Sequence, residues 1–262
     1  MDKWGDKPYH SLDYENKKRF GEKVYKISLA GGTTCPNRDG TLGTRGCCFC
    51  SGSGSGDFAA TKGSITEQIE EAIARVSRYK NAGHHFTAYF QSFTATYAPV
   101  ETLRAAWEEA MAHESVATLA IATRPDCLGD DVLSLLADCC RKMPVTVELG
   151  LQTIHPDTIR YIRRGYPNSV YETAVKNLKN IGVNVVTHVI AGLPGETKEN
   201  FLDTVRYVAD IGSDGIKLQL LHVLKGTDLA LDYENKMFRT LTPDEYLDYI
   251  TEALSILPPD MV

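Results

Sequence analysis

Six short apolar runs, rich in Val, Ile, Leu and Phe, recur along the sequence and are separated by longer segments of helical periodicity. Runs of this length and composition predict buried β-strands, each followed by a helix. The predicted strands are Val24–Leu29, Phe86–Gln91, Val116–Ala122, Val145–Leu151, Asn184–Ala191 and Gly215–Leu221. Strands that alternate with helices in this way imply a parallel sheet with right-handed connections.

The segments between the predicted strands carry helix start signals. Ser64, Ser169 and Thr242 each stand three positions before a Glu, which is the spacing of a capping box. Behind Ser64 and Thr242, apolar residues recur at the spacing of a single helix face. We therefore expect helices that lay one apolar face against a buried sheet.

A doubly wound sheet and a (β/α) barrel both fit this alternation, and periodicity does not separate them. Six βα units use up the 262 residues, and the loop 51–56 is too short to act as a linker. We predict a single domain over residues 1–262, with an N-terminal extension at 1–22. The last residues, Leu257–Val262, stop on what looks like the start of another element, which indicates a truncated C-terminus.

The formal net charge of −6 gives no general attraction to nucleic acid or to anionic membranes. No apolar run approaches the roughly 20 residues that a membrane-spanning helix needs. Residues 1–20 are too polar for a signal peptide, so we expect a cytoplasmic protein without membrane contact. One set of basic residues could form a patch that binds a polyanion or could lie on a solvated face, and the negative net charge of the chain favours the solvated face. The set is Lys17, Lys18, Arg19, Lys23, Lys26, Arg160, Arg163 and Arg164.

Four of the seven cysteines lie close together, directly after the first predicted strand. Cys47 and Cys50 form a C-x-x-C pair, and Cys35 lies upstream of them. The odd total and the chain length argue against a secreted disulfide scaffold. A C-x-x-C loop suits thiolate ligands to iron or zinc, and three ligands leave one metal position open. We predict a metal-binding loop over residues 31–58, with Cys48 a bystander because it is out of the C-x-x-C register.

The cysteine spacing alone also fits other kinds of protein. A zinc-stabilised, non-catalytic binding module on a β/α barrel would need a fourth ligand from Cys48, His84 or His85. A thioredoxin-like redox pair would leave Cys35 unexplained. A phosphate-binding metabolic barrel enzyme with incidental cysteines would keep its activity after the loop cysteines are replaced by Ala.

Polar residues interrupt or follow the predicted strands near their carboxyl ends, where buried parallel strands are usually apolar. Alternation along the fourth strand puts Glu148 and Gln152 on one face. Gln91 ends the second strand, Arg124 follows the third, and His188 interrupts the fifth. Each alone is explained as a satisfied buried polar group. Because all five converge on the rim that carries the cysteine loop, we predict a binding site there.

The run C-P-N-R-D-G-T-x-G-x-x-G-C-x-F-C, from Cys35 to Cys50, resembles the cluster loop of radical S-adenosylmethionine (SAM) enzymes. Within that superfamily it is similar to the YhcC/YtqA-like group, which is related to the Elongator catalytic subunit and to oxygen-independent coproporphyrinogen oxidase. Further segments share the resemblance. They are Tyr97–Pro99, Thr123–Asp126, Glu148–Thr153, Arg163–Tyr166, Val189–Glu196 and His222–Thr227.

The resemblance implies a partial (β/α)6 TIM-type barrel with a [4Fe–4S] cluster on Cys35, Cys47 and Cys50. SAM, bound at the open iron, would be cleaved by one electron to a 5′-deoxyadenosyl radical that abstracts hydrogen from a substrate. The resemblance also implies a reductant such as flavodoxin or ferredoxin as a partner. It implies tRNA as the substrate class, with modification of a wobble uridine as the reaction.

The resemblance carries roles onto individual positions of this sequence. Phe49 would pack near the adenine, and Gln152 would reach the ribose hydroxyls. Arg164 would bind the SAM carboxylate as a charge-assisted partner. His188 and Gly192 would line the nucleoside end, where a glycine lets the backbone approach a ligand closely.

Three further positions complete the predicted SAM-binding set. Many superfamily members have a Gly-Gly-Glu stretch after the second strand that holds the SAM amino group, and Gln91 stands in its place here. Arg124 and Glu148 are also predicted to contact SAM, because they lie near the carboxyl ends of the third and fourth predicted strands. Arg163 lies next to Arg164, so either arginine could face the site.

Overall fold

The computed structural model describes residues 4–54, 56–57, 59 and 63–262. Positions 1–3 of the predicted N-terminal extension and positions 55 and 58 of the predicted loop lie outside the described residues. All six predicted strands are confirmed, with ends that agree to within one residue. They are β1 (Tyr25–Leu29), β2 (Phe86–Phe90), β3 (Val116–Thr123), β4 (Val145–Gln152), β5 (Asn184–Ala191) and β6 (Gly215–Leu220).

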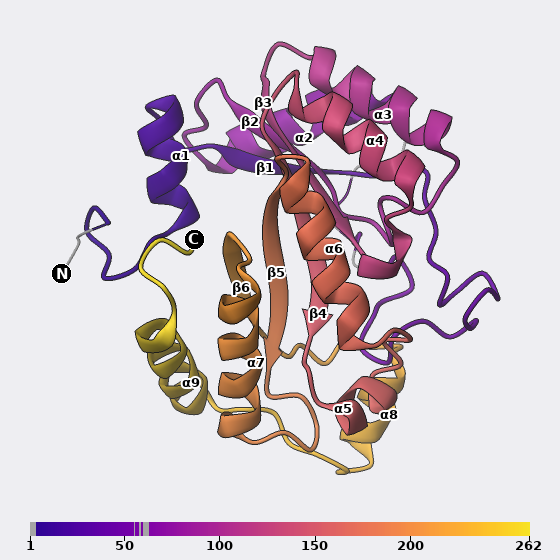
Figure 1. The fold of residues 1–262 in the computed structure, drawn as a ribbon, viewed down its shortest axis with the longest axis vertical. Coiled ribbons are helices and arrows are strands. Elements are labelled where there is room, and N and C mark those ends of the chain that lie inside the picture. Colours follow the sequence, from indigo (N-terminus) through magenta and orange to yellow (C-terminus); the bar gives the residue numbers. More distant parts are fainter. Residues whose placement is uncertain (1–3, 55, 58, 60–62) are drawn as a thin grey trace.

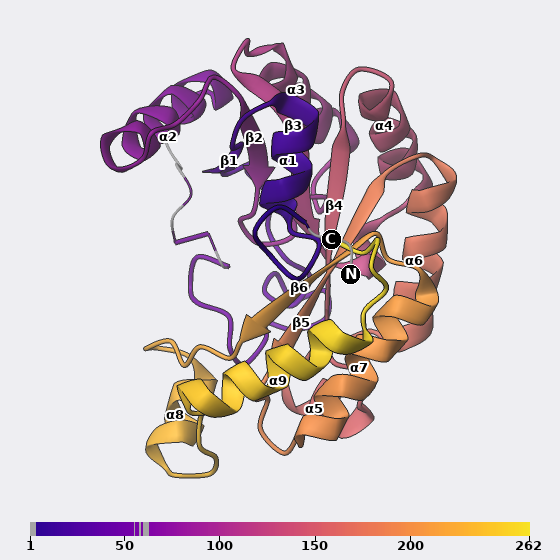
Figure 2. The ribbon, with the colours of Figure 1, turned by 90° about the vertical axis from the view of Figure 1, so that its left-hand side faces the viewer.

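The six strands form one parallel sheet in the order β1-β2-β3-β4-β5-β6. A doubly wound sheet reverses its strand order at a switch point, whereas a barrel adds each strand beside the one before it. The consecutive order therefore identifies the barrel. The sheet curls without closing, and within the described chain β1 and β6 are its edges (Figures 1 and 2). This confirms the predicted partial (β/α)6 barrel.

Helices cover the outer face of the sheet (Figure 1). The connecting helices are α2 (Ile65–Tyr79), α3 (Val100–Ala112), α4 (Asp130–Cys140), α6 (Asn168–Asn180) and α7 (Lys198–Ile211), with the shorter η1 (Pro125–Cys127) and α5 (Pro156–Tyr161). The core lies between these helices and the strands and includes Phe90, Trp107 and Tyr171, all fully buried. None of the described helices is long and apolar enough to cross a bilayer.

Two of the three predicted capping boxes are confirmed. Ser64 caps α2, and Thr242 caps α9 (Pro243–Ile256), each with the reciprocal glutamate bond. The prediction at Ser169 is wrong, because α6 already begins at Asn168 with Pro167 as its N-cap residue. Proline suits this place since it has no N–H to satisfy and its φ is fixed.

The terminal segments meet at the amino-terminal end of the barrel. α1 (Leu12–Phe20) lies close to the last residues of the chain (Figures 1 and 2), and His10 Nδ1 is 3.1 Å from the carbonyl oxygen of Asp260. Val262 hydrogen-bonds with the backbone of Asp214 and Ile216 beside β6. After β6, the chain forms α8 (Asp228–Glu234) before α9.

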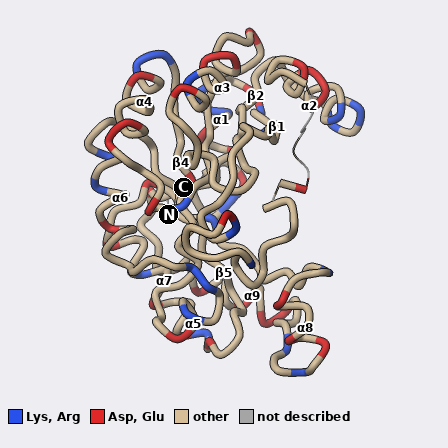
Figure 3. The backbone as a smooth tube through the Cα atoms, turned by 90° about the vertical axis from the view of Figure 1, so that its right-hand side faces the viewer, with Lys and Arg blue, Asp and Glu red and all other residues tan. Residues whose placement is uncertain are grey.

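The set of basic residues proposed from the sequence does not share one surface. Lys26 points into the barrel and pairs with Glu148, and Arg164 is 1% exposed. Arg163 pairs with Asp228. Lys26, Arg163 and Arg164 are therefore not part of a solvated face. The other five residues, Lys17, Lys18, Arg19, Lys23 and Arg160, are exposed as that interpretation expects. On the outer helices, basic and acidic residues are interspersed (Figure 3).

Candidate functional site

A cleft of about 300 Å³ opens at the carboxyl ends of the strands. Cys35, Cys47 and Cys50 line it from the loop between β1 and α2, and each is half-buried. Two backbone turns shape this loop. Arg38 N donates to Cys35 O (2.8 Å), and Cys50 N donates to Cys47 O (3.1 Å). The sequence motif thus folds into turns that present its three thiols to one cleft.

Side chains of the loop hold this arrangement together. Asn37 is buried, and its Nδ2 donates to Arg163 O (2.7 Å) and to Cys47 Sγ (3.5 Å). Arg38 Nη2 donates to Cys50 O (3.1 Å). Burial raises the pKa of the Cys47 thiol to about 11, and a metal that binds this sulfur must displace its proton.

Cys48 belongs to a separate environment. It is 3% exposed and packs in a small apolar cluster with Ile162, Leu193, Leu221 and Leu229. Its carbonyl accepts from Leu229 N at 3.0 Å. Cys48 does not line the cleft that Cys35, Cys47 and Cys50 share, and its status as a bystander to metal binding stays a prediction.

The spacing of the donors bears on which metal group could fit. Among the described residues, no three His, Cys, Asp or Glu side chains are placed to hold a single metal ion. A structural zinc needs four ligands, with its sulfur ligands about 2.3 Å from one ion. The thiolates of a cubane bind different irons and stand further apart. Among the described residues, the three thiols of the cleft thus lack the fourth ligand that a structural zinc needs, whereas a cluster that keeps one iron open needs only three thiolates.

The cleft brings together most of the residues predicted to contact SAM. Those that line it are Phe49, Gln91, Arg124, Glu148, Gln152, Arg164 and His188. Gly192, also a predicted contact, lies outside this lining. It follows β5 at φ +83°, and a Cβ atom there would approach Leu241 Cγ to 2.9 Å. Close packing against a side chain of this protein thus accounts for this glycine.

Strained backbone surrounds the cleft. Phe93, Gln152 and Arg163 have φ values of 57°, 63° and 58°, in the left-handed region that non-glycine residues rarely adopt. Gln152 sits where the β4–β5 register shifts, and such bulges re-aim a side chain. Each such residue costs about 1–3 kcal/mol, and strain of this kind concentrates at functional sites.

Arg164 is fully engaged by the protein. Its guanidinium donates to the carbonyls of Leu151 (3.0 Å), Thr153 (2.7 Å) and Tyr166 (2.8 and 3.1 Å) and to Asn168 Oδ1 (2.8 Å). These bonds use all five N–H donors that a guanidinium has. Arg164 therefore ties the end of β4 to the segment that precedes α6, with no N–H left over for a SAM carboxylate.

Arg124 is also paired within the protein. Its guanidinium binds both carboxylate oxygens of Asp126 at 2.9 and 2.7 Å and lies 4.9 Å from the ring centre of Tyr166. A bidentate pair of this kind fixes the direction of the arginine.

Glu148 is the centre of a polar cluster inside the barrel. It is 1% exposed and accepts from Lys26 Nζ, Tyr89 OH (2.8 Å) and His188 Nε2 (2.6 Å). These contacts hold the pKa of the carboxyl well below its usual range despite burial. Burial lowers the pKa of His188, and its Nε2–H donates to the carboxylate, which can only accept.

Sequence reasoning missed the basic residues of this cluster. Lys26 and Lys217 lie at inward-facing positions of β1 and β6, and Lys217 pairs in register with His188. Each is flanked by apolar neighbours. The same alternation that pointed to Glu148 would have identified both lysines.

Comparisons with known proteins agree with this geometry. The family model of the Radical SAM superfamily matches residues 19–208, and that of the Radical_SAM C-terminal domain matches residues 213–262. YtqA of Bacillus subtilis is 42% identical over 98% of this chain and 80% of its own length. YhcC of Escherichia coli is 37% identical over 94% of this chain and 78% of its own length.

More distant similarities extend the comparison. A tRNA uridine(34) acetyltransferase of Methanocaldococcus jannaschii is 29% identical over 57% of this chain and 28% of its own length. The solved structure of Elp3 from Methanocaldococcus infernus superposes with a TM-score of 0.67 at 19% identity and covers 91% of this chain. The chain spans about half the length (55%) of that protein, and the likeness shows the fold. The protein belongs to the radical SAM superfamily, within the group that includes YtqA and YhcC.

Proposed function

We propose that the protein is an enzyme that holds a [4Fe–4S] cluster on Cys35, Cys47 and Cys50 and acts on a substrate through SAM. The observation that carries the proposal is the convergence of these thiols with strand-end polar residues on one cleft. Once bound and reduced by a partner such as flavodoxin or ferredoxin, the cluster would supply the electron that cleaves SAM to a 5′-deoxyadenosyl radical for hydrogen abstraction.

Residues of the cleft would bind and orient SAM. Phe49, between the two cysteines of the C-x-x-C pair, offers an aromatic face for the adenine. Gln152, re-aimed by the bulge into the cleft, would reach the ribose hydroxyls with its amide. The Oε1 atom of Gln91 accepts from Ser28 Oγ (3.1 Å) and has a second lone pair for the SAM ammonium group.

Two predicted contacts would act indirectly. Arg164 donates to carbonyls at the end of β4, and we assign it the role of positioning Gln152. Glu148 lies below the cleft rim and orients His188 through its 2.6 Å contact with Nε2. Both side chains shape the nucleoside end without direct contact to SAM.

The proposal is tested by supplying SAM and dithionite to the anaerobically reconstituted protein and measuring 5′-deoxyadenosine by chromatography. We expect its release from the wild-type protein and none from Cys47→Ala. Equal release from both proteins would show that the cleavage does not need this cluster site.

We further propose tRNA as the substrate class, with modification of a wobble uridine as the reaction. The support is the similarity to a protein named for tRNA uridine(34) chemistry. The net charge of −6 opposes non-specific binding, so affinity for tRNA must come from local contacts. A binding assay with bulk tRNA at low salt tests this, and the absence of binding would contradict it.

A further inference from the structure

The floor of the cleft carries more positive than negative charge. Among the described residues that line the cleft, Glu148 alone bears a carboxylate. Two lysines share it, because Lys26 hydrogen-bonds to Oε1 and Lys217 Nζ lies 3.7 Å from Oε2. One carboxylate between two ammonium groups leaves a surplus of one positive charge inside the barrel.

Lys217 is the lysine whose positive charge lacks a full counterion. Lys26, Tyr89 and His188 already occupy acceptor sites of Glu148 within hydrogen-bonding distance. At 3.7 Å, the ammonium of Lys217 is too far for a normal hydrogen bond to Glu148. Burial lowers the pKa of Lys217, and the charge of Lys26 acts in the same direction.

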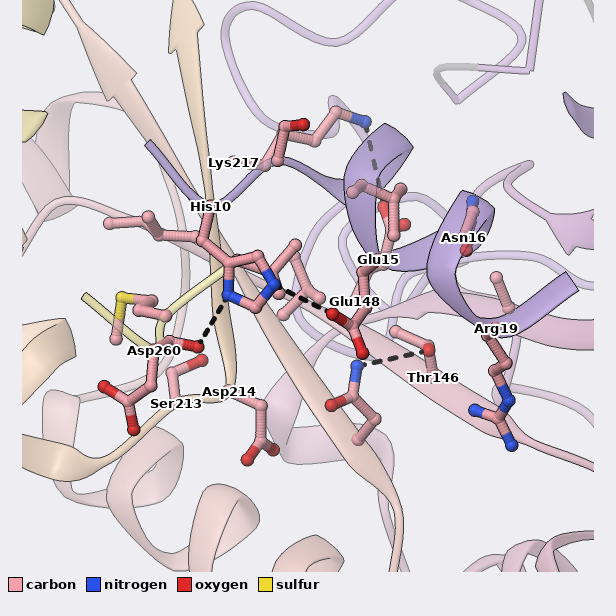
Figure 4. Close-up of a pocket in the computed structure, with 18 of the residues that line it drawn as sticks. His10, Glu15, Asn16, Arg19, Thr146, Glu148, Ser213, Asp214, Lys217 and Asp260 are labelled. Atoms are coloured by element: carbon pink, nitrogen blue, oxygen red, sulfur yellow. Dashed lines mark hydrogen bonds and ion pairs between the residues drawn. The ribbon is translucent and has the colours of Figure 1, made fainter. Parts of the chain in front are cut away.

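Lys217 is also accessible, in contrast to its partner. Its side chain is 41% exposed, whereas that of Glu148 is 1% exposed. It borders both the cleft and a second cavity of about 2040 Å³ at the amino-terminal end of the barrel. Figure 4 shows this second cavity, with Lys217, Glu148 and His10 among the residues that line it and His10 bonded to Glu15 and Asp260.

Lys217 lies on a part of the cleft that is available to a substrate. It lies on β6, whereas the cysteine loop follows β1, and these strands are the two opposite edges of the sheet. None of the predicted SAM contacts lies on β6, so the β6 side of the cleft is left for another molecule. Gln219, two residues along the same face of β6, adds a polar group to this wall.

We propose that Lys217 binds an oxyanion, a carboxylate or a phosphate, of the substrate at the β6 side of the cleft. The anion neutralises the charge that Glu148 leaves uncompensated, which a neutral substrate group would not do. The inference deepens the proposed function and rests on it in taking this cleft as the place of reaction.

The test measures binding of small anions to the cluster-loaded protein at constant ionic strength, from the rise in its melting temperature with ligand concentration. The probes are acetate and inorganic phosphate, and acetamide is the neutral control for acetate. We expect acetate to bind wild-type protein, and Lys217→Gln to bind it about tenfold more weakly, the loss of one charge-assisted hydrogen bond. Stronger binding of phosphate than of acetate would assign the oxyanion to a phosphate, and the reverse to a carboxylate.

A second variant tests the charge count itself. Lys26→Gln keeps Lys217 but frees Glu148 to pair with it, so the surplus charge disappears and acetate binding should weaken as well. Lys176→Gln, at an exposed position of α6, should bind acetate like the wild type. Wild-type affinity in Lys217→Gln, or equal binding of acetate and acetamide, would overturn the proposal.

The same assay with SAM present separates the substrate from the cofactor. Acetate should still bind when SAM is saturating. Competition between acetate and SAM would show that Lys217 binds the SAM carboxylate, and it would refute the proposal that Lys217 binds the substrate. Because this assay detects anion binding and the release of 5′-deoxyadenosine detects SAM cleavage, failure of one hypothesis is distinguishable from failure of the other.

Discussion

At the scale of single residues, Glu148 concentrates the electrostatics of the barrel interior. Its carboxyl group is buried, and the bond from His188 and the charges of Lys26 and Lys217 keep its pKa below the usual value. The ionised carboxylate accepts hydrogen bonds from Lys26, Tyr89 and His188, and these donors have it as their partner. Removing its charge leaves those groups without a counterion, which typically costs about 3–5 kcal/mol.

This linkage predicts a pH dependence of stability. Because the folded-state pKa of Glu148 lies below the unfolded value of about 4.3, its stabilisation is complete above that pH and is lost as the pH falls through the folded-state pKa. Glu148→Gln should therefore be less stable than wild type at neutral pH, and the difference should shrink in acid. Urea unfolding of both proteins, prepared without iron, measures this, and a pH-independent difference would contradict it.

Arg164 yields a second prediction at this scale. A lysine ammonium cannot span the carbonyls of Leu151, Thr153 and Tyr166 that the guanidinium reaches. Arg164→Lys should thus lower the free energy of unfolding by about 2 kcal/mol or more, since buried acceptors lose their donors. Chemical unfolding and SAM titration of the variant test this. A variant of wild-type stability with much weaker SAM binding would show that Arg164 holds the carboxylate after all.

Sequence reasoning was strongest for residues whose type and spacing carry chemistry. The cysteine motif needs no fold to be recognised, and the strand-end residues followed from alternation. Side-chain partners are different, because they depend on which strands become neighbours. Lys26 and Glu148 are far apart in sequence and meet across the barrel. Lys26, expected on a solvated face or in a polyanion patch, is therefore an interior ion-pair partner.

At the scale of elements, the turn after β5 tests why a glycine stands at position 192. Gly192 and Gly195 both have φ values of +83°, but a Cβ atom at Gly192 would meet Leu241, whereas at Gly195 it would have no neighbour within 4 Å. Gly195→Ala should cost about 1–2 kcal/mol for the backbone conformation alone. Gly192→Ala should cost about 1–3 kcal/mol more through overpacking. Thermal unfolding compares the two variants, and equal losses would contradict the packing argument.

Element boundaries show where local sequence decides structure. Strand ends were predictable because each apolar run ends where the chain turns away from the buried sheet. Ser169 shows the opposite case, because its capping-box spacing lost to Pro167, whose fixed backbone begins α6 earlier. The capping box at Thr197 was not predicted, since its partner is Asn200, where Glu or Gln is usual.

At the scale of the whole molecule, strand order separates a barrel from a doubly wound sheet, and periodicity carries no information on that order. The hollow interior has a simpler origin. Thr87, Thr118, Ala120 and Thr146 line the cavity at the amino-terminal end, whereas the bulky branched residues common in TIM barrels fill the interior. Small side chains on the inner face therefore leave room within the sheet.

The central claim is that Cys35, Cys47 and Cys50, and not Cys48, hold a [4Fe–4S] cluster. Iron and sulfide analysis with an absorption spectrum, on anaerobically reconstituted wild type and single Cys→Ala variants, tests it most directly. We predict about four irons per chain and a broad band near 400 nm for wild type and Cys48→Ala, and loss of both when any of the other three is replaced. Zinc without iron in the wild type, or iron loss confined to Cys48→Ala, would contradict the account.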